Sequence, residues 1–188
     1  MGEVAIELVS PSELGIAFDV EQDGKTYVAN ARKKARAAVA ASGLPALADD
    51  SGLEVAALDG KPGVESAYFA GREHYGDSQA LCEALLRALG DRVADGAAAS
   101  FRCTAVLLLP DGREFVGEGV LSGSVAAPAR GDHGFGFDPV FRLTDGRHLA
   151  ELSLEEKNLL SHRARALNAL EVHGAFDAAM TAEPGRSG

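Results

Sequence analysis

The chain has 188 residues, 46% of them hydrophobic, which is enough to bury a core as one medium-sized domain or as two small lobes that share a core, and excludes intrinsic disorder. Eighteen Lys and Arg against 28 Asp and Glu give a formal net charge of −10. That is the wrong sign for stable binding to a nucleic-acid backbone, although a divalent cation would still allow an acidic chain to handle phosphates. No window reaches the roughly 18 apolar residues of a membrane span, and the N-terminus lacks a leader pattern, so we expect a cytoplasmic protein with no membrane partner.

The first half of the chain predicts a strand, a helix and two further strands. Residues 4–9 alternate weakly and are typical of a short strand, and the Ala-rich, basic stretch 26–42 predicts a helix. The apolar run 44–48 predicts a strand that stops at residues 49–52, where Asp, Ser and Gly indicate a turn. A strand-like pattern resumes over residues 53–58, so we expect a pair of carboxylates at a strand end.

The middle of the chain predicts a loop, a helix and a long hairpin. Residues 59–76, rich in Gly and charge, indicate a loop with a short helical turn, and residues 77–89 carry leucines on one helical face. Residues 99–109 and 113–125 predict the longest strands, because Pro110-Asp111-Gly112 between them is typical of a hairpin turn.

The last third predicts a loop, a helix and a tail. Residues 131–141, rich in Gly and Phe, indicate a loop that leads into a short strand. Residues 153–156 form a capping box, which predicts the start of a helix that continues to about residue 173. We therefore expect a single domain over residues 1–176 and a disordered tail over residues 177–188.

The adjacent carboxylates Asp49 and Asp50 are the first candidate site. Two such groups at a strand end can hold a hard cation such as Mg²⁺ and still orient a water molecule. The alternative is that Asp-Ser-Gly here is only turn chemistry, because these residues dominate turns for unrelated reasons.

The start of the last helix is the second candidate. Lys157, Ser161, His162 and Arg163 gather titratable groups near free backbone N–H groups, which favours a phosphate or base-edge site. The alternative is a solvated basic helix face.

The third candidate is the segment Gly134-Phe135-Gly136-Phe137-Asp138-Pro139. Its glycines allow close approach of the backbone to a ligand, and an aromatic ring offers a stacking platform. Phe137 is equally consistent with core packing.

Other sites are excluded by spacing. The sequence has no GxGxxG or P-loop motif, and its five histidines lack zinc-site spacing. We expect Cys82 and Cys103 to be buried free thiols.

Five separated motifs, in order, resemble the inosine triphosphate pyrophosphatase family, also called the non-canonical purine NTP pyrophosphatases. The resemblance covers about residues 21–170. The motifs are residues 26–35 (Thr-Tyr-Val-Ala-Asn-Ala-Arg-Lys-Lys-Ala), 48–55 (Ala-Asp-Asp-Ser-Gly-Leu-Glu-Val), 62–64 (Pro-Gly-Val), 134–139 (Gly-Phe-Gly-Phe-Asp-Pro) and 161–163 (Ser-His-Arg).

The resemblance implies a Mg²⁺-dependent hydrolase that cleaves ITP, dITP and XTP between the α and β phosphates, which removes these nucleotides from the cellular pool. It also implies an α/β fold with a long mixed β-sheet flanked by helices. Two lobes would enclose a nucleotide cleft, and the protein would be a homodimer.

The resemblance also assigns roles to residues. Asp50 would be the general base for water, and Glu21 with Asp50 would hold Mg²⁺. The remaining site residues would contact the nucleotide: Lys34, Ser51, Phe135, Gly136, Phe137, Asp138, Lys157, His162 and Arg163. Within that set, the two lysines would contact phosphates or the base, Phe135 would stack on the purine, and Asp138, His162 and Arg163 would help to read the base edge.

Two departures from the family pattern leave alternatives open. Family members begin with a strand and a Ser/Thr-x-Asn-x-x-Lys loop that wraps the triphosphate, and this sequence contains no such motif, so we expect an N-terminally shortened chain. Where the family has Ser-Ala-Arg, this chain has Ser66-Ala67-Tyr68. The missing loop favours, as an alternative, a non-catalytic nucleotide-binding or dimer-partner protein. A Maf-like pyrophosphatase for other nucleotides is a third hypothesis, which the motifs at 134–139 and 161–163 disfavour.

Overall fold

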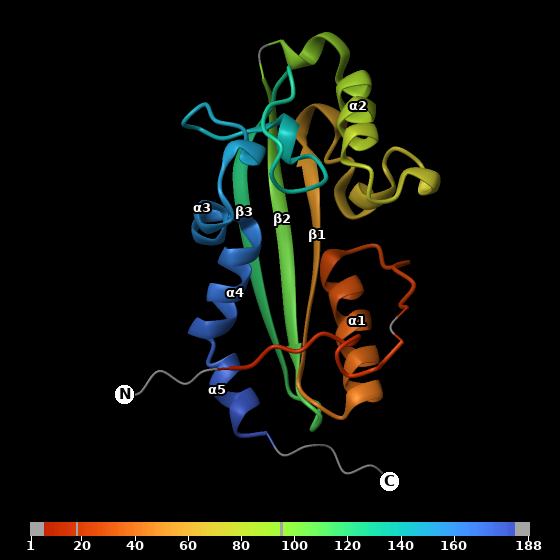
Figure 1. Cartoon of the computed structure of the whole chain (residues 1–188), viewed down its shortest axis with the longest axis vertical. Coiled ribbons are helices and arrows are strands. Elements are labelled where there is room, and N and C mark those ends of the chain that lie inside the picture. The colour runs from red at the N-terminus through yellow and green to blue at the C-terminus, as the bar shows by residue number, and fades with distance from the viewer. Residues whose placement is uncertain (1–5, 18, 95, 183–188) are drawn as a thin grey trace.

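The computed structural model describes residues 6–17, 19–94 and 96–182 (Figure 1). The helices are α1 (Tyr27–Ser42), α2 (Ser78–Leu89), α3 (Leu154–Leu160), α4 (His162–Val172) and α5 (Ala175–Met180). The strands are β1 (Ala46–Val55), β2 (Ala97–Leu108), β3 (Glu114–Val125) and β4 (Phe141–Arg142). Within the described residues, six short 3-10 helices connect them: η1 (Ala56–Leu58), η2 (Gly63–Tyr68), η3 (Arg72–His74), η4 (Gly90–Val93), η5 (Asp138–Val140) and η6 (Leu149–Glu151). No helix in these described ranges has the length and apolarity needed to cross a bilayer.

The four described strands form one sheet in the order β1-β2-β3-β4, and every neighbouring pair is antiparallel. The α/β class is confirmed, whereas the expectation of a mixed sheet is wrong for these strands. The hairpin at residues 110–112 reverses the chain between β2 and β3. The long connection over residues 56–96 enters β2 from the end at which β1 left the sheet, so it makes no parallel crossover.

Helices cover both faces of the sheet because successive residues of a strand point to opposite sides (Figure 1). One face of β2 packs under α1 in a cluster of Ala31, Ala35, Val106 and Leu108. The opposite face packs under α4 and α5 in a cluster of Cys103, Ala105, Leu107, Leu109, Ala166, Leu170 and Ala175. A third and larger cluster joins α2 to the other end of the sheet and includes Leu53, Leu85, Phe101, Leu121 and Phe141.

The predicted helix over residues 153–173 is two helices, which meet at Ser161. The backbone of Ser161 is extended (ψ 159°), and its side chain accepts a hydrogen bond from Ala164 N, so it caps the start of α4. The capping box that begins α3 is confirmed, because Ser153 and Glu156 bond to each other's backbone N–H groups. Ser161 therefore changes the direction of the chain between two sets of predicted site residues.

The N-terminal prediction fails where it can be checked. Residues 6–9 form no strand, and the side chain of Leu8 is 73% exposed. Their weak alternation has no partner strand to pair with in the described part of the chain. Residues 4 and 5, the start of the predicted strand, lie outside the described residues.

The C-terminal prediction is corrected in part. Residues 177–180, expected to begin a disordered tail, belong to α5, because the buried Ala175 and the neighbouring Phe176 pack against the cluster under α4. Residues 183–188 lie outside the described residues. The single domain over residues 1–176 stays a prediction.

Candidate active site

The predicted turn at residues 49–52 lies inside one continuous strand. All ten residues of β1 pair with β2, with Asp49 opposite Ala105 and Gly52 opposite Arg102. The chain does not reverse at residues 49–52, so the turn interpretation is wrong. The strand predicted over residues 53–58 is the end of β1 and stops at Val55, after which η1 begins. The two carboxylates therefore sit in the middle of a strand rather than at its end.

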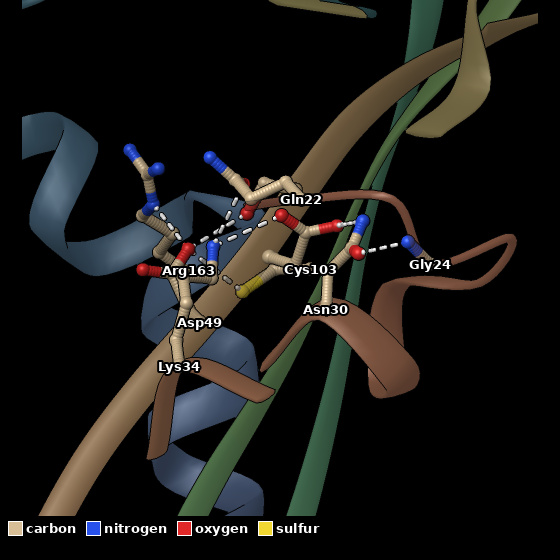
Figure 2. Close-up of polar contacts among 9 residues, drawn as sticks. Gln22, Gly24, Asn30, Lys34, Asp49, Cys103 and Arg163 are labelled. Carbon is tan, nitrogen blue, oxygen red and sulfur yellow. Dashed lines mark hydrogen bonds and ion pairs between the residues drawn. The ribbon is translucent and has the colours of Figure 1, made fainter. Parts of the chain in front are cut away.

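Because neighbouring side chains on a strand alternate, Asp49 and Asp50 leave β1 on opposite faces. Asp50 faces α1, where Asn30 Nδ2 donates to its Oδ2 at 3.1 Å and Lys34 Nζ donates to its Oδ1 at 3.0 Å. Asp49 faces α4, where Arg163 Nε donates to its Oδ2 at 2.9 Å (Figure 2). Two adjacent carboxylates thus serve two different parts of the site.

Asp50 is held in a fixed orientation. Its side chain is buried, and burial raises the pKa of the Asp50 carboxyl above its ordinary value, which Lys34 only partly offsets. The orientation of Asn30 is itself defined, because its Oδ1 accepts a hydrogen bond from Gly24 N at 2.8 Å (Figure 2). The Asn30 amide must then present its NH₂ group to Asp50.

Asp49 is held by three donors. Besides Arg163, the Ser51 hydroxyl donates to its Oδ2 at 2.9 Å and the Cys103 thiol lies 3.7 Å from the same oxygen. Burial alone would raise the pKa of Asp49, but the charge and hydrogen bond of Arg163, with Ser51, outweigh it, so the pKa lies below its ordinary value. Asp49 is therefore ionised at neutral pH.

A cleft of about 1060 Å³ runs beside β1 and collects all but one of the predicted site residues. They are Lys34, Asp50, Ser51, Phe135, Gly136, Phe137, Asp138, Lys157, His162 and Arg163. Glu21 is the exception: it is exposed and does not line the cleft. In the irregular segment before α1, the neighbouring Gln22 lines the cleft instead and accepts a hydrogen bond from Lys34 Nζ at 3.2 Å.

Another part of the cleft presents an aromatic ring beside two cations. Phe135 is 59% exposed, with Lys157 Nζ 5.8 Å and Arg163 Cζ 5.0 Å from its ring centroid. The buried Asp138 fixes this arrangement, because its Oδ2 accepts from Lys157 Nζ at 2.5 Å and from Phe135 N at 3.1 Å. Gly134 adopts a left-handed φ of 87°, and a Cβ there would collide with Asp138 and Lys157.

Helix α2 anchors the same loop. Gly136 N donates to Ser78 Oγ at 2.7 Å, and Cys82 Sγ donates to Gly136 O at 3.3 Å. Sequence reasoning missed Ser78 as a support, since it lies 58 residues from its partner. Cys82 and Cys103 are free and buried, which confirms the prediction for both thiols.

The profile of the Ham1 family matches residues 1–173. The chain belongs to the Ham1 family. A relative from Geobacter sulfurreducens is 47% identical over 82% of this chain and 77% of its own length. A relative from Streptomyces coelicolor is 47% identical over 81% of this chain and 76% of its own length. Both are named dITP/XTP pyrophosphatase. These matches confirm the resemblance drawn from the five motifs.

Solved structures of Ham1 proteins share the fold. The Staphylococcus aureus Ham1 protein superposes with a TM-score of 0.80 at 39% identity, covering 91% of this chain and 88% of that one. A HAM1 protein from Coxiella burnetii gives a TM-score of 0.81 at 38% identity, covering 93% and 88%.

Two aromatic side chains of the predicted site are buried in this Ham1 chain. Phe137 is 3% exposed and packs edge-on against Phe69, with ring centroids 6.4 Å apart, so it belongs to the core and offers no open face for stacking. His162 is 8% exposed and stacks on Phe101 at 4.8 Å. Burial, and then the charge of Arg163, lower the pKa of His162 to about 4, so the ring is neutral at pH 7. Within the described residues its buried Nδ1 has no hydrogen-bond partner.

The Ser-Ala-Tyr departure also lies in the cleft. Ser66 Oγ accepts from Leu53 N at 2.9 Å and donates to Gly63 O at 2.6 Å, which ties η2 to β1. Tyr68 stacks on Tyr75 with ring centroids 5.4 Å apart, and both line the cleft. The sequence offered no signal for Tyr75, because only the fold of residues 68–75 brings the two rings together.

The donor set suits a cation that arrives with its substrate. Within residues 6–17, 19–94 and 96–182, no group of three or more His, Cys, Asp or Glu side chains gathers that could hold a metal ion. Mg²⁺ is commonly bound by one or two carboxylates together with substrate phosphates, rather than by a complete protein cage. Asp50, a carboxylate beside Lys34 in the cleft, fits that pattern as a single protein ligand.

Proposed function

We propose that this chain hydrolyses non-canonical purine nucleoside triphosphates (XTP, dITP and ITP) to the monophosphate and pyrophosphate. One observation carries the proposal: a single cleft joins an exposed aromatic ring, flanked by two cations, to a buried carboxylate paired with a lysine. Its volume of about 1060 Å³ is adequate for a nucleotide. The names of the Geobacter and Streptomyces relatives support the same activity.

Asp50 is the general base in this proposal. Hydrolysis of the anhydride between the α and β phosphates consumes one water, and Asp50 accepts the proton that this water loses. Asn30 and Lys34 keep the carboxylate in place, so little reorganisation is needed during the reaction.

The charge of the triphosphate requires cations that an acidic chain must concentrate locally. Lys34 supplies one beside Asp50, and Lys157 supplies another at the Phe135 end. Mg²⁺, held by Asp50 together with the phosphates, would neutralise charge and polarise a phosphoryl oxygen. The net charge of −10 is then compatible with a nucleotide substrate.

Base selection follows from the groups around Phe135. A purine stacked on this ring lies near the guanidinium of Arg163 and the ammonium of Lys157, both of which only donate hydrogen bonds. Hypoxanthine and xanthine present a carbonyl at C6, whereas adenine presents an amino group. Adenine would leave such donors unpaired, at about 1 to 3 kcal/mol per group, which selects against ATP.

The test is an assay of pyrophosphate release from XTP, dITP, ITP and ATP, with and without Mg²⁺. We expect release from the first three well above that from ATP, and none without a divalent cation. Equal rates on ATP would contradict the selectivity. Orthophosphate as the product would contradict the cleavage position. Nucleotide binding without turnover would favour the non-catalytic alternative.

A further inference from the structure

We propose that Asp49 is a positioning residue that tethers Arg163 beside the Phe135 ring and thereby sets the selectivity for the base. The inference rests on the proposed function and deepens it. In this proposal the two neighbouring carboxylates of β1 have different roles. Asp50 serves the reacting phosphates from the α1 face, and Asp49 serves the base from the α4 face.

The way Arg163 is held leaves its donors available. Asp49 contacts Arg163 only through Nε, at 2.9 Å. Arginine carries five N–H donors, so the two terminal nitrogens keep four of them. These nitrogens make no hydrogen bond within the described part of the chain, and the guanidinium carbon lies 5.0 Å from the Phe135 centroid. The tether thus fixes the side chain while leaving its outer edge free for a ligand.

The tether is needed because Arg163 is otherwise free to move. Its side chain is 42% exposed. Without Asp49, the guanidinium has two alternatives: it can lie fully over the Phe135 ring, where it competes with a stacked base, or it can turn into solvent. Either movement removes its donors from the edge of the base.

Asp49 is itself built into a rigid support. Ser51 donates to it, and Cys103, directly opposite Ser51 in the strand register, lies on the same side of the sheet. The carboxylate is therefore fixed by its own strand and by β2. The pair is partly exposed, at 42% for Arg163 and 37% for Asp49, and ion pairs open to solvent contribute only about 0 to 1 kcal/mol to stability. We therefore attribute the arrangement to positioning rather than to stabilisation of the fold.

The test is Asp49→Asn, which removes the charge at nearly constant volume. We expect the kcat for XTP to stay within about threefold of wild type. The KM should rise about tenfold, and the ratio of kcat/KM for XTP over ATP should fall about tenfold, as loss of one charged hydrogen bond to the base predicts. A variant whose kcat falls while KM and the XTP/ATP ratio stay unchanged would overturn the proposal.

A double-mutant cycle separates positioning from an independent role. Arg163→Lys keeps the charge but lacks the Nε that Asp49 binds, so we expect a similar loss of selectivity. Adding Asp49→Asn to Arg163→Lys should then change the XTP/ATP ratio less than twofold, because the tether is already broken. Additive effects of the two changes would contradict the proposal. Should Asp49→Asn fail to fold, unchanged selectivity in Arg163→Lys would overturn it equally.

Asp111→Asn is the matched control. It breaks an Asp–Arg pair of similar length, 2.7 Å, and similar exposure, in the hairpin that ends β2, and neither partner lines the cleft. Its selectivity should equal that of wild type.

Calorimetry with XMP and AMP tests the same tether without turnover. Wild type should prefer XMP, and Asp49→Asn should lose that preference. An inactive wild type that still prefers XMP, with the preference lost in Asp49→Asn, would contradict the proposed hydrolysis but support the tether. An equal XMP preference in wild type and variant, or none in wild type, would overturn the tether.

Discussion

Asp50 and its two donors form a small rigid unit on one face of β1. Asn30 and Lys34 lie four residues apart on α1, a spacing that places both side chains on the same helix face toward the carboxylate. Asn30 is only 2% exposed, so its amide has no competing solvent. The catalytic role proposed for Asp50 depends on this fixed geometry as much as on the carboxylate itself.

We predict that Asp50→Asn abolishes turnover and leaves the fold intact. The amide nearly preserves the volume but cannot accept the proton of the attacking water. Removal of a buried charge offsets part of the lost contact with Lys34, so the change in the free energy of unfolding should stay within about 2 kcal/mol. The measurements are kcat with XTP and a thermal melt. A variant that keeps more than about a tenth of the wild-type kcat would contradict the role.

Sequence reasoning could find the residues whose chemistry is carried by a local motif. Asp50, Lys157 and Arg163 were predicted to line one site, and all three line the cleft. Asn30 was missed, although its spacing from Lys34 was a usable signal. Glu21 is exposed and does not line the cleft, and its role as a Mg²⁺ ligand stays a prediction.

At the scale of elements, the break at Ser161 determines how the Phe135 end of the cleft is built. The apolar stripe that predicts one helix over residues 153–173 is continuous, so it gives no sign of a break. Serine is tolerated inside helices, yet it is also among the best residues at their start. The break lets α3 carry Lys157 toward Asp138 while α4 carries Arg163 toward Asp49. Two short helices reach two partners that one straight helix would not.

We predict that Ser161→Ala lowers both stability and base selectivity. It removes the hydroxyl that accepts a hydrogen bond from Ala164 N at 3.2 Å, which costs about 1 kcal/mol for a helix N-cap. It also loosens the first turn of α4, which carries Arg163. The measurements are a thermal melt and the XTP/ATP ratio of kcat/KM.

Thr26→Ala is the matched control for that change. Thr26 caps α1 by accepting a hydrogen bond from Ala29 N at 3.3 Å, but it does not line the cleft. A comparable loss of stability with unchanged selectivity is expected. If Ser161→Ala and Thr26→Ala had the same XTP/ATP selectivity, the α4 cap would contribute only to stability and not to base selection.

At the scale of the whole molecule, the cleft depends on contacts that no local pattern encodes. Asp49 and Arg163 lie 114 residues apart, and Gly136 and Ser78 lie 58 apart. The sequence also does not determine the direction of β2 relative to β1, because the connection over residues 56–96 is long enough for either a parallel or an antiparallel return. The elements themselves were predictable from periodicity and turn residues, whereas their directions and mutual contacts were not. The two lobes and the homodimer stay predictions.

We predict that the fold loses stability in mildly acidic solution because of His162. Its pKa of about 4 in the folded protein lies below the ordinary value of 6.5. Below pH 6.5 the unfolded chain therefore binds a proton that the folded chain resists, and stability falls as the pH decreases toward 4. The difference between those two values corresponds to about 3 kcal/mol when the pH lies below both of them.

The pH dependence can be assigned to this one ring by comparing wild type with His162→Phe between pH 6.5 and 5. Phenylalanine keeps the stacking on Phe101 and cannot titrate. The raised pKa of Asp50 acts in the opposite direction, since its protonation in acid favours the folded state, but it is present in both proteins and cancels in the difference. The free energy of unfolding from denaturant titrations should fall more steeply with acid in wild type than in the variant. Parallel curves would show that protonation of His162 does not control acid stability, and would contradict the lowered pKa of this ring in the folded protein.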